Sequence, residues 1–251
     1  MLRGASIMHK SVNSVECSEH GVRDATSVCQ HLVSGIASGF NYAKDEGDPF
    51  QRWPDAWCDA CEQVRASEGG WNDRSEKLVN VRLLCDGCYQ RARERNWKQD
   101  DQAFRMLVDD ATAYLQTRQD QLLAQYGIGS YPRYDWDQET GQLIFSDNGQ
   151  ARVIADIQFV GSVSPQSHTW LWSWANQSIQ ESVKGRVRTV RTYGDDHRFL
   201  KLSSACWAAD EADGWDMTAI CAYLTSAAGA YKSPDDRGST FLVITDIRWA
   251  R

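Results

Sequence analysis

The sequence contains no long uninterrupted apolar stretch. None of its segments approaches the roughly 18 apolar residues that a membrane-spanning helix needs, so we expect no transmembrane segment. Residues 1–12 also lack the apolar core of a secretory signal peptide, and we therefore expect a cytoplasmic protein. In that reducing compartment, eight cysteines argue against a disulfide framework and for bound metal.

The chain also has no excess of basic residues. The formal net charge is -7, with 13 basic and 15 acidic residues in positions 1–100 and 14 and 19 in the remainder. Neither part has the basic balance with which a general nucleic-acid-binding protein neutralises phosphates. An acidic surface instead suits solubility or docking onto a basic partner.

Familiar catalytic motifs are absent. The chain has no G-x-S-x-G, no phosphate-binding glycine loop and no H-E-x-x-H. Asp195, Asp196 and His197 could serve acid–base chemistry, although such a run is more often a solvated loop or helix end. Cys206 and Cys221 lie among apolar neighbours, which is typical of buried structural cysteines. We therefore expect no enzymatic activity, with chemistry at Asp195, Asp196 or His197 as the alternative.

The first hundred residues do contain four short pairs of metal-binding residues: Cys17-x2-His20, Cys29-x-His31, Cys58-x2-Cys61 and Cys85-x2-Cys88. Thiolate sulfur and imidazole nitrogen are the ligands of tetrahedral zinc, and a C-x2-C turn directs two sulfurs at one ion. Eight ligands make two closed sites that leave no position for a catalytic water. We predict two structural zinc ions that fold a module with few apolar patterns of its own.

Two pairings of these ligands are open. Sequential pairing, which we prefer, gives a site of two cysteines and two histidines over 17–31 and a four-cysteine site over 58–88. A cross-brace instead joins the first pair with the third and the second with the fourth. The four-cysteine half resembles a treble-clef zinc finger, because its last pair leads into a predicted helix. The first half resembles the opening of B-box-type zinc fingers apart from its short C-x-H pair, and a surface histidine at His20 or His31 is the alternative.

After residue 98 the sequence changes to regular helix and strand patterns. Apolar residues at helical spacing predict a helix over 102–125, which Gly127 and Gly129 end. Strand patterns predict an antiparallel meander, followed by a helix from about Gln177 that Asn176 can cap and that Gly185 can interrupt before 187–193. A second helix and a final strand follow. The expected strands are 131–137, 142–146, 151–164, 169–175 and 240–249. The second helix is expected over 216–227. We therefore expect an α+β protein with a small two-zinc N-terminal module (1–98) and an antiparallel sheet packed with helices (99–251).

Tryptophan is abundant, with 11 residues, and we expect most of them in the core. In the 169–175 strand, Trp170, Trp172 and Trp174 should share one face. In the last strand, the expected common face consists of alternate residues: Phe241, Val243, Thr245, Ile247 and Trp249.

Two further tryptophans lie within a bunch of acidic residues near the start of the 216–227 helix. Aromatic anchors among carboxylates suit docking onto a basic protein face, and an ordinary solvated loop is the alternative. The candidate partner-binding residues are Asp195, Asp196, Trp207, Asp210, Glu211, Asp213, Trp215 and Asp216.

Two stretches carry a resemblance to known sequences. The segments Val28–Cys29–Gln30–His31–Leu32 and Leu84–Cys85–Asp86–Gly87–Cys88–Tyr89 are similar to a zinc-binding segment of bacterial proteins. The segment Thr169–Trp170–Leu171–Trp172–Ser173–Trp174–Ala175–Asn176 resembles an uncharacterised bacterial α+β family with a W-x-W-A-N motif. Families of this type resemble immunity proteins, which are encoded beside interbacterial toxins such as those of type VI secretion.

The resemblance implies an immunity protein that binds a cognate toxin, such as a nuclease, and occludes its active site. The acidic balance, the tryptophan supply and the missing catalytic motifs agree with this hypothesis. The alternative is a zinc-finger nucleic-acid-binding or regulatory protein, suggested by the basic run Arg91, Arg93, Arg95 and Lys98.

Overall fold

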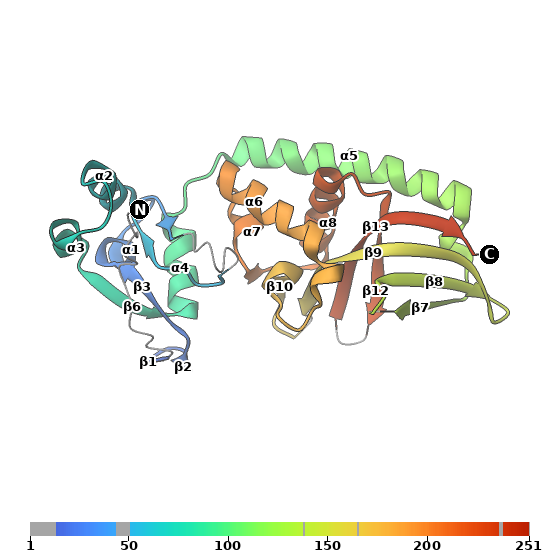
Figure 1. Ribbon diagram of the computed structural model, residues 1–251, viewed down its shortest axis with the longest axis horizontal. Coiled ribbons are helices and arrows are strands. Elements are labelled where there is room, and N and C mark those ends of the chain that lie inside the picture. The colour runs from blue at the N-terminus through green and yellow to red at the C-terminus, as the bar shows by residue number, and fades with distance from the viewer. Residues whose placement is uncertain (1–13, 44–50, 138, 165, 236–237, 251) are drawn as a thin grey trace, which may run out of the picture. The chain divides into compact units, whose positions relative to one another are not determined.

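The computed structural model describes residues 14–43, 51–137, 139–164, 166–235 and 238–250 (Figure 1). The chain divides into two compact units, Met1–Lys98 and Gln99–Arg251. We call them the N-terminal unit and the C-terminal unit and describe each by itself. No helix in the described part of the chain is both long and apolar enough to cross a membrane.

The N-terminal unit combines short strands with short helices. A four-stranded sheet has the order β4-β5-β3-β6, and β1 and β2 form a separate hairpin. The elements are β1 (Val15–Cys17), β2 (Gly21–Arg23), β3 (Ala25–Cys29), α1 (Gln30–Ser34), β4 (Asn41–Tyr42), β5 (Ala56–Trp57), α2 (Asp59–Ser67), α3 (Asp73–Val79), β6 (Val81–Cys85) and α4 (Asp86–Asn96).

The core of this unit is small and includes metal-ligand candidates. Cys29, Cys58 and Cys61 are buried in one apolar cluster with larger side chains, among them Val28, Leu32, Phe40, Trp57, Val79 and Tyr89. The Arg93 side chain is buried over the ring of Trp97, at 4.8 Å. A core of this size gains from metal cross-links, since small modules bury too little apolar surface to offset the entropy of folding.

The C-terminal unit has one seven-stranded sheet and three longer helices. Its elements are α5 (Asp101–Tyr126), β7 (Arg133–Asp137), β8 (Gln142–Asp147), β9 (Gln150–Ser164), β10 (Thr169–Trp172), α6 (Arg188–His197), α7 (Leu200–Ser203), β11 (Cys206–Ala208), α8 (Glu211–Thr225), β12 (Gly229–Asp235) and β13 (Gly238–Trp249), with 3-10 turns at Ile128–Ser130, Ser173–Ala175, Glu181–Val183 and Gly185–Val187. This architecture confirms the predicted α+β fold class with an antiparallel sheet packed with helices.

The long strand β9 organises the sheet. It pairs antiparallel with β13 along most of its length, with β8 over its first half and with β10 over its last residues. Since β7 pairs with β8, the strands β7, β8 and β9 form an antiparallel meander as predicted. The fourth strand departs from the prediction, because β10 pairs with the end of β9 on the same edge that β8 uses, while β13 occupies the other edge. The turn between β8 and β9 contains Asn148 and Gly149, both with positive φ, as a two-residue hairpin turn of type I′ requires.

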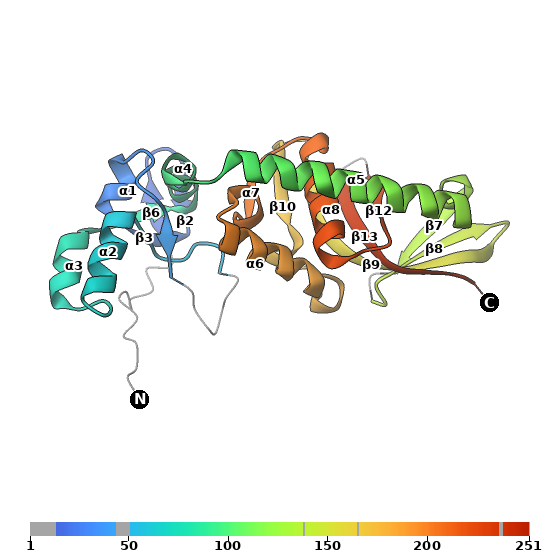
Figure 2. The ribbon, with the colours of Figure 1, turned by 90° about the horizontal axis from the view of Figure 1, so that it is seen from above.

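Helices α5 and α8 pack together on this sheet. Helix α5 runs along the whole C-terminal unit, and α8 lies beside it and against β9 and β13 (Figure 2). Leu122 of α5 joins an apolar cluster with sheet residues such as Phe145, Ile157 and Leu242. Gly214 of α8 permits close approach to β13, because a Cβ there would lie 2.5 Å from the Phe241 ring.

Three further details of the sequence prediction are wrong. The 169–175 strand ends at Trp172, and Trp174 lies in a 3-10 turn where the Arg191 guanidinium sits 4.5 Å from its ring. The first part of the helix predicted from Gln177 is absent and 3-10 turns take its place, whereas the stretch expected over 187–193 lies almost entirely in α6. Asn176 holds a turn, because its side-chain oxygen accepts hydrogen bonds from the backbone and hydroxyl of Ser178.

The third detail is the face of the last strand. A register shift between Ile244 and Asp246 places Thr245 as an extra residue opposite β9. Such a bulge reverses the alternation of side chains. Ile244 and Ile247 therefore join the same apolar cluster, and Trp249 is 54% exposed.

Candidate metal centres

The structure brings the eight predicted ligands together in two groups of four. The first group, which we call the hairpin site, consists of Cys17, His20, Cys85 and Cys88. The second, the core site, consists of Cys29, His31, Cys58 and Cys61. Within each group the ligand atoms all lie within 4.8 Å of one another, so each group could hold one metal ion.

Neither predicted pairing is correct. The first pair of ligands joins the fourth and the second joins the third, which is a nested arrangement. The expected four-cysteine site does not form, because Cys58–Cys61 and Cys85–Cys88 belong to different groups. Each group instead has three cysteines and one histidine, and both histidines have a place among the ligands.

Strand direction explains the nesting. Cys29, Cys58 and Cys85 each end a strand or follow one directly, at the junction with the next helix. Strands β3 and β5 are parallel, so Cys29 and Cys58 lie at the same end of the sheet. Strands β3 and β6 are antiparallel with Ala25 opposite Cys85, so Cys85 lies at the other end, where the chain arrives from the β1–β2 hairpin.

Helix starts position the cysteines of both sites. Cys58 and Cys85 are the N-cap residues of α2 and α4, and Cys61 and Cys88 follow one turn later. The Cys88 backbone N–H donates to the Cys85 Sγ at 3.4 Å, and the Cys58 N–H donates to the Cys29 Sγ at 3.3 Å. Unpaired N–H groups at a helix start stabilise thiolates.

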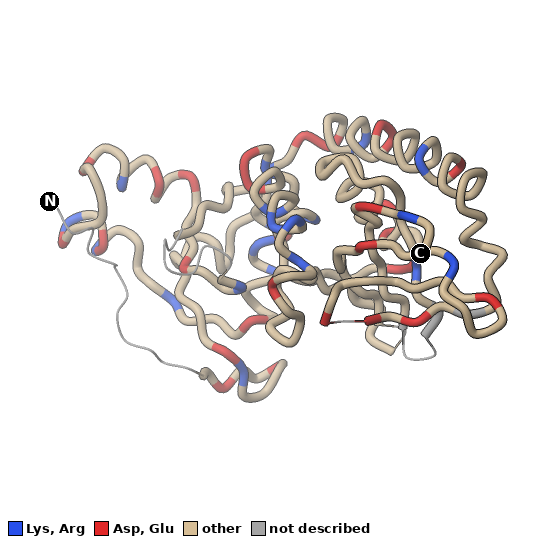
Figure 3. The backbone as a smooth tube through the Cα atoms, turned by 45° about the vertical axis from the view of Figure 1, so that its right-hand side comes forward, with Lys and Arg blue, Asp and Glu red and all other residues tan. Residues whose placement is uncertain are grey.

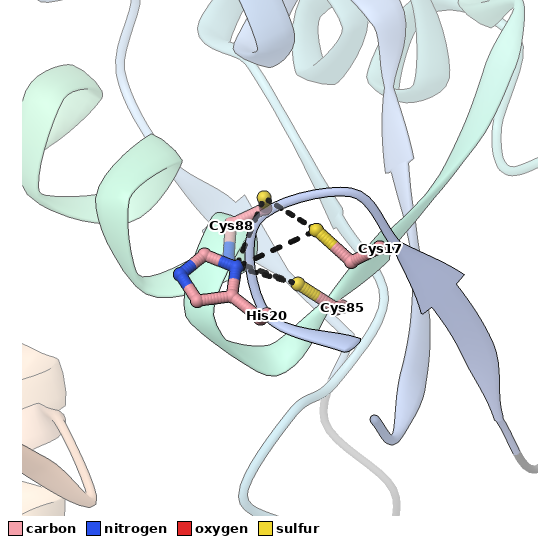
Figure 4. A group of neighbouring side chains, drawn as sticks. All are labelled: Cys17, His20, Cys85 and Cys88. Carbon is pink, nitrogen blue, oxygen red and sulfur yellow. Dashed lines mark hydrogen bonds between the residues drawn. The ribbon is translucent and has the colours of Figure 1, made fainter. Parts of the chain in front are cut away.

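The hairpin site has the dimensions of a tetrahedral zinc site. Figure 4 shows His20 Nδ1 turned toward three sulfurs, at 3.5 Å from Cys17, 3.3 Å from Cys85 and 3.7 Å from Cys88. The Cys17 and Cys88 sulfurs are 3.8 Å apart. Zinc bond lengths of about 2.3 Å to sulfur and about 2.0 Å to nitrogen at tetrahedral angles give separations of about 3.8 Å between sulfurs and about 3.5 Å between sulfur and nitrogen. The donor set therefore fits zinc.

The core site matches in chemistry and differs in surroundings. His31 Nδ1 lies 3.3 Å from the Cys61 Sγ, so both histidines present the same ring nitrogen. The three cysteines of the core site are buried, whereas Cys17 and Cys88 of the hairpin site are half-buried. The two sites thus offer one donor set in two degrees of enclosure.

The thiols of each site perturb one another. Backbone N–H groups of Glu19 and His20 lower the pKa of Cys17 to about 6, and hydrogen bonding with Cys61 lowers the pKa of Cys29 to about 5. The Cys29 sulfur in turn raises the pKa of Cys61, and burial raises the pKa of Cys85 to about 11. Crowded thiols cannot all ionise unless a cation neutralises them, which is what a bound metal supplies.

Two residues at the hairpin site escaped the sequence analysis. Arg91 donates a hydrogen bond to the Cys88 Sγ at 3.4 Å and forms an ion pair with Glu19. Gly87 makes room for the His20 imidazole, because a Cβ at this position would lie 2.9 Å from its Nε2. The sequence offered one signal for Arg91, because it is a basic residue three positions after the last cysteine. The sequence analysis attributed it to a basic run instead.

The predicted partner-binding residues have mixed surroundings. Asp195 pairs with the buried Arg191 at 3.1 Å and is itself nearly buried, whereas Asp196 is exposed. Trp207 is buried, and its indole N–H donates to the Lys201 carbonyl. Asp195 and Trp207 therefore stabilise the fold and offer little surface.

The remaining candidates surround the start of α8. Asp210 and Asp213 form a reciprocal capping box, and Asp213 also pairs with Lys201 at 2.7 Å. Glu211 pairs with Lys232 at 2.6 Å, and Trp215 is 37% exposed while its ring contacts Phe241 edge-on.

Asp216 is the carboxylate most affected by its neighbours. Burial raises its pKa, and the nearby carboxylates of Asp213, Asp210 and Asp109 raise it further against the opposing effect of Lys201. Asp109 lies on α5, where acidic and basic positions follow one another along the helix (Figure 3). The structure thus adds Asp109 to the acidic group that the sequence placed on α8.

The W-x-W-A-N segment is part of the fold of the C-terminal unit. Trp172 is fully buried and donates through its indole N–H to the Lys201 carbonyl at 2.8 Å. The Asn176 carbonyl accepts a hydrogen bond from the buried Lys184 ammonium at 2.8 Å. These contacts give the segment a structural role.

A family of unknown function, DUF6882, matches residues 105–247, which is more than half of the chain. The chain belongs to this family. The match begins within α5 and ends within β13, so the DUF6882 region lies entirely in the C-terminal unit and excludes both metal sites. No curated protein and no solved structure matches the chain.

Proposed function

We propose that this DUF6882 protein is a zinc-stabilised, cytoplasmic immunity protein that binds a basic cognate toxin and occludes its active site. The toxin is of the interbacterial, type VI secretion-like kind, for example a nuclease. Zinc is part of the proposal, because three thiolates and an imidazole at tetrahedral spacing favour this ion. With four protein ligands available at each site, the metal supports the fold and takes no part in chemistry.

The observation that carries the proposal is the acidic surface around the start of α8. Asp109, Asp213 and Asp216 come together from two helices, and Lys201 is the cation that acts on Asp216 against them. Trp215 lies next to this group with more than a third of its surface exposed. Concentrated negative charge beside an exposed indole suits a basic protein surface, because the charge steers association and the ring anchors the complex.

The basic run of α4 gives little support to the nucleic-acid alternative. Arg91 contacts Glu19 and Cys88, and Lys98 pairs with Asp59 at 2.8 Å. Arg95 donates to the carbonyl oxygens of Leu32, Val33 and Gly35, and Arg93 is buried. Side chains already engaged in this way have few donors left for phosphates.

Binding of the toxin encoded by the adjacent gene tests the proposal. The full-length protein should form a complex with it in size-exclusion chromatography and protect cells that express it. Asp109→Lys should weaken binding at least tenfold, because Asp109 is exposed and faces the acidic group. Asp120→Lys is the matched control, since it reverses an exposed charge further along the same helix.

Absence of a complex and of protection would reject the immunity proposal. Equal loss of binding in both charge-reversal variants would reject the acidic surface as the contact region. Salt-sensitive binding of DNA or RNA in a gel-shift assay, without toxin binding, would favour the nucleic-acid alternative.

A further inference from the structure

The two metal sites are connected to the N-terminal unit in different ways. In the core site, Cys29, Cys58 and Cys61 belong to the main apolar cluster of the unit. They join the ends of β3 and β5 to the starts of α1 and α2. An ion in this site would cross-link segments that already pack against one another.

The hairpin site instead joins an exposed segment to the rest of the unit. Cys17 and His20 come from the β1–β2 hairpin, and none of residues 14–24 is buried. Val22, the large apolar residue of β2, is 71% exposed. The hairpin therefore brings almost no apolar burial that could hold it in place.

Contacts at the site itself link the hairpin to α4. His20 Nδ1 lies among the sulfurs of Cys85 and Cys88, and the Glu19 carboxylate pairs with Arg91. Arg91 also donates to the Cys88 sulfur. The Arg91 guanidinium thus contacts Cys88, a ligand on α4, and Glu19, which lies between the hairpin ligands Cys17 and His20. Both Arg91 and Glu19 are about half exposed, so this ion pair alone would contribute little.

We propose that the ion in the hairpin site is an exchangeable clip that fixes the β1–β2 hairpin to α4, whereas the ion in the core site is integral to folding. Arg91 is a positioning residue of the clip: it holds the Cys88 thiolate and offsets the net charge of -1 that one Zn²⁺ and three thiolates carry. Removal of the first ion frees the hairpin and leaves the remaining N-terminal unit folded. The inference rests on the zinc part of the proposed function and is independent of any toxin.

Metal release from the full-length protein tests this inference. The zinc-loaded protein is mixed with a chromophoric chelator, and ion loss is followed by absorbance and by native mass spectrometry. We expect two ions per chain, with the first released at least tenfold faster than the second. Trypsin should then cleave after Arg23, because this residue is exposed and its side chain donates a hydrogen bond to the His20 carbonyl within the hairpin itself.

Variants separate the two sites. Cys17→Ser should retain one ion and a folded unit, with cleavage after Arg23 at least tenfold faster than in the wild type. Cys58→Ser should lose tight binding of both ions, because the scaffold of the hairpin site depends on the core. Arg91→Ala should speed release of the first ion severalfold and leave the second unchanged, and Arg91→Lys should restore part of the difference. Arg74→Ala is the matched control, because Arg74 is an exposed arginine of the same unit paired with Glu68.

The outcomes distinguish this inference from the proposed function. Release of both ions in one phase, or unfolding of the N-terminal unit in Cys17→Ser, would overturn the clip and leave the zinc proposal intact. A wild-type protein that binds no zinc would overturn both. Toxin binding has no bearing on either result.

Discussion

The two units of this chain reach a stable fold by different routes. The N-terminal unit places three ligand cysteines in its main apolar cluster, among a small set of large side chains such as Phe40, Trp57 and Tyr89. The C-terminal unit buries a seven-stranded sheet under α5 and α8, with Trp170 and Trp172 fully enclosed. We therefore expect the first to need metal in order to fold, and the second to fold on its buried apolar surface alone.

The extent of the family match agrees with this difference. DUF6882 covers 105–247, which lies within the unit that buries the large antiparallel sheet. A domain with a sufficient core of its own can fold independently of the module beside it. This comparison predicts that the two units respond separately to loss of metal and to core substitutions.

Removal of metal should have the largest effect. Chelation with excess EDTA should unfold the N-terminal unit, because zinc contributes on the order of 10 kcal/mol to small zinc modules at neutral pH. The C-terminal unit should keep its cooperative thermal transition in calorimetry, and added Zn²⁺ should restore the lost one. Loss of both transitions together would mean that the units are not independent.

Substitution of a buried tryptophan should give the reverse result. Trp172→Ala removes a fully buried ring that packs edge-on against Trp170 at 5.2 Å. We expect a loss of about 3–5 kcal/mol from the C-terminal unit, with zinc content unchanged. Trp249→Ala is the control, and its 54% exposure predicts a much smaller loss. Denaturant unfolding followed by circular dichroism would measure both.

Gly87→Ala should produce a smaller and local effect. The added Cβ would lie 2.9 Å from the His20 Nε2, so the imidazole must shift from its place among the sulfurs. We expect a cost of about 1–2 kcal/mol at the hairpin site, seen as severalfold faster release of one ion. Gly185→Ala, where no atom lies within 4 Å of the new Cβ, should leave ion release unchanged. Equal release rates in the two variants would contradict the proposed role of Gly87.

Local patterns in the sequence were sufficient to predict much of this organisation. Helical spacing predicted α5, and strand patterns predicted the positions of β7, β8, β9 and β10, because these features depend on neighbouring residues. The identity of the eight ligands also followed from short spacings. Their pairing did not, because it depends on whether β3 lies parallel or antiparallel to β5 and β6, and local spacing carries no such information.

The remaining errors have a similar origin. The predicted helix after Asn176 was displaced because the chain first forms turns held by the buried Lys184. The face of β13 changed because Thr245 is an extra residue opposite β9. Arg91 was assigned to a basic run, because its contact with Glu19 arises only when the hairpin lies against α4. The pairing of β13 with β9 and the contact of Arg91 with Glu19 join segments that are distant in sequence, and local patterns do not predict such contacts.

We expect the smallest effect from Asp216→Asn, a substitution that tests stability and partner binding of the C-terminal unit separately. Because burial and nearby carboxylates raise the pKa of Asp216, its charged form opposes folding at neutral pH. A raised pKa in the folded state means that stability increases as pH falls through the folded pKa toward the ordinary pKa of an aspartate. Asp216→Asn should therefore stabilise the C-terminal unit at pH 7 by less than about 1 kcal/mol, since solvent screens this half-exposed group.

The advantage of Asp216→Asn should shrink as pH is lowered and Asp216 itself becomes protonated. Thermal unfolding of both proteins between pH 4 and pH 7 would measure it, with Asp120→Asn as a control whose difference from wild type should stay near zero. If the acidic surface binds a basic partner, the same variant should bind more weakly while it is more stable. A stabilised variant with full binding would place the contact region elsewhere on the C-terminal unit.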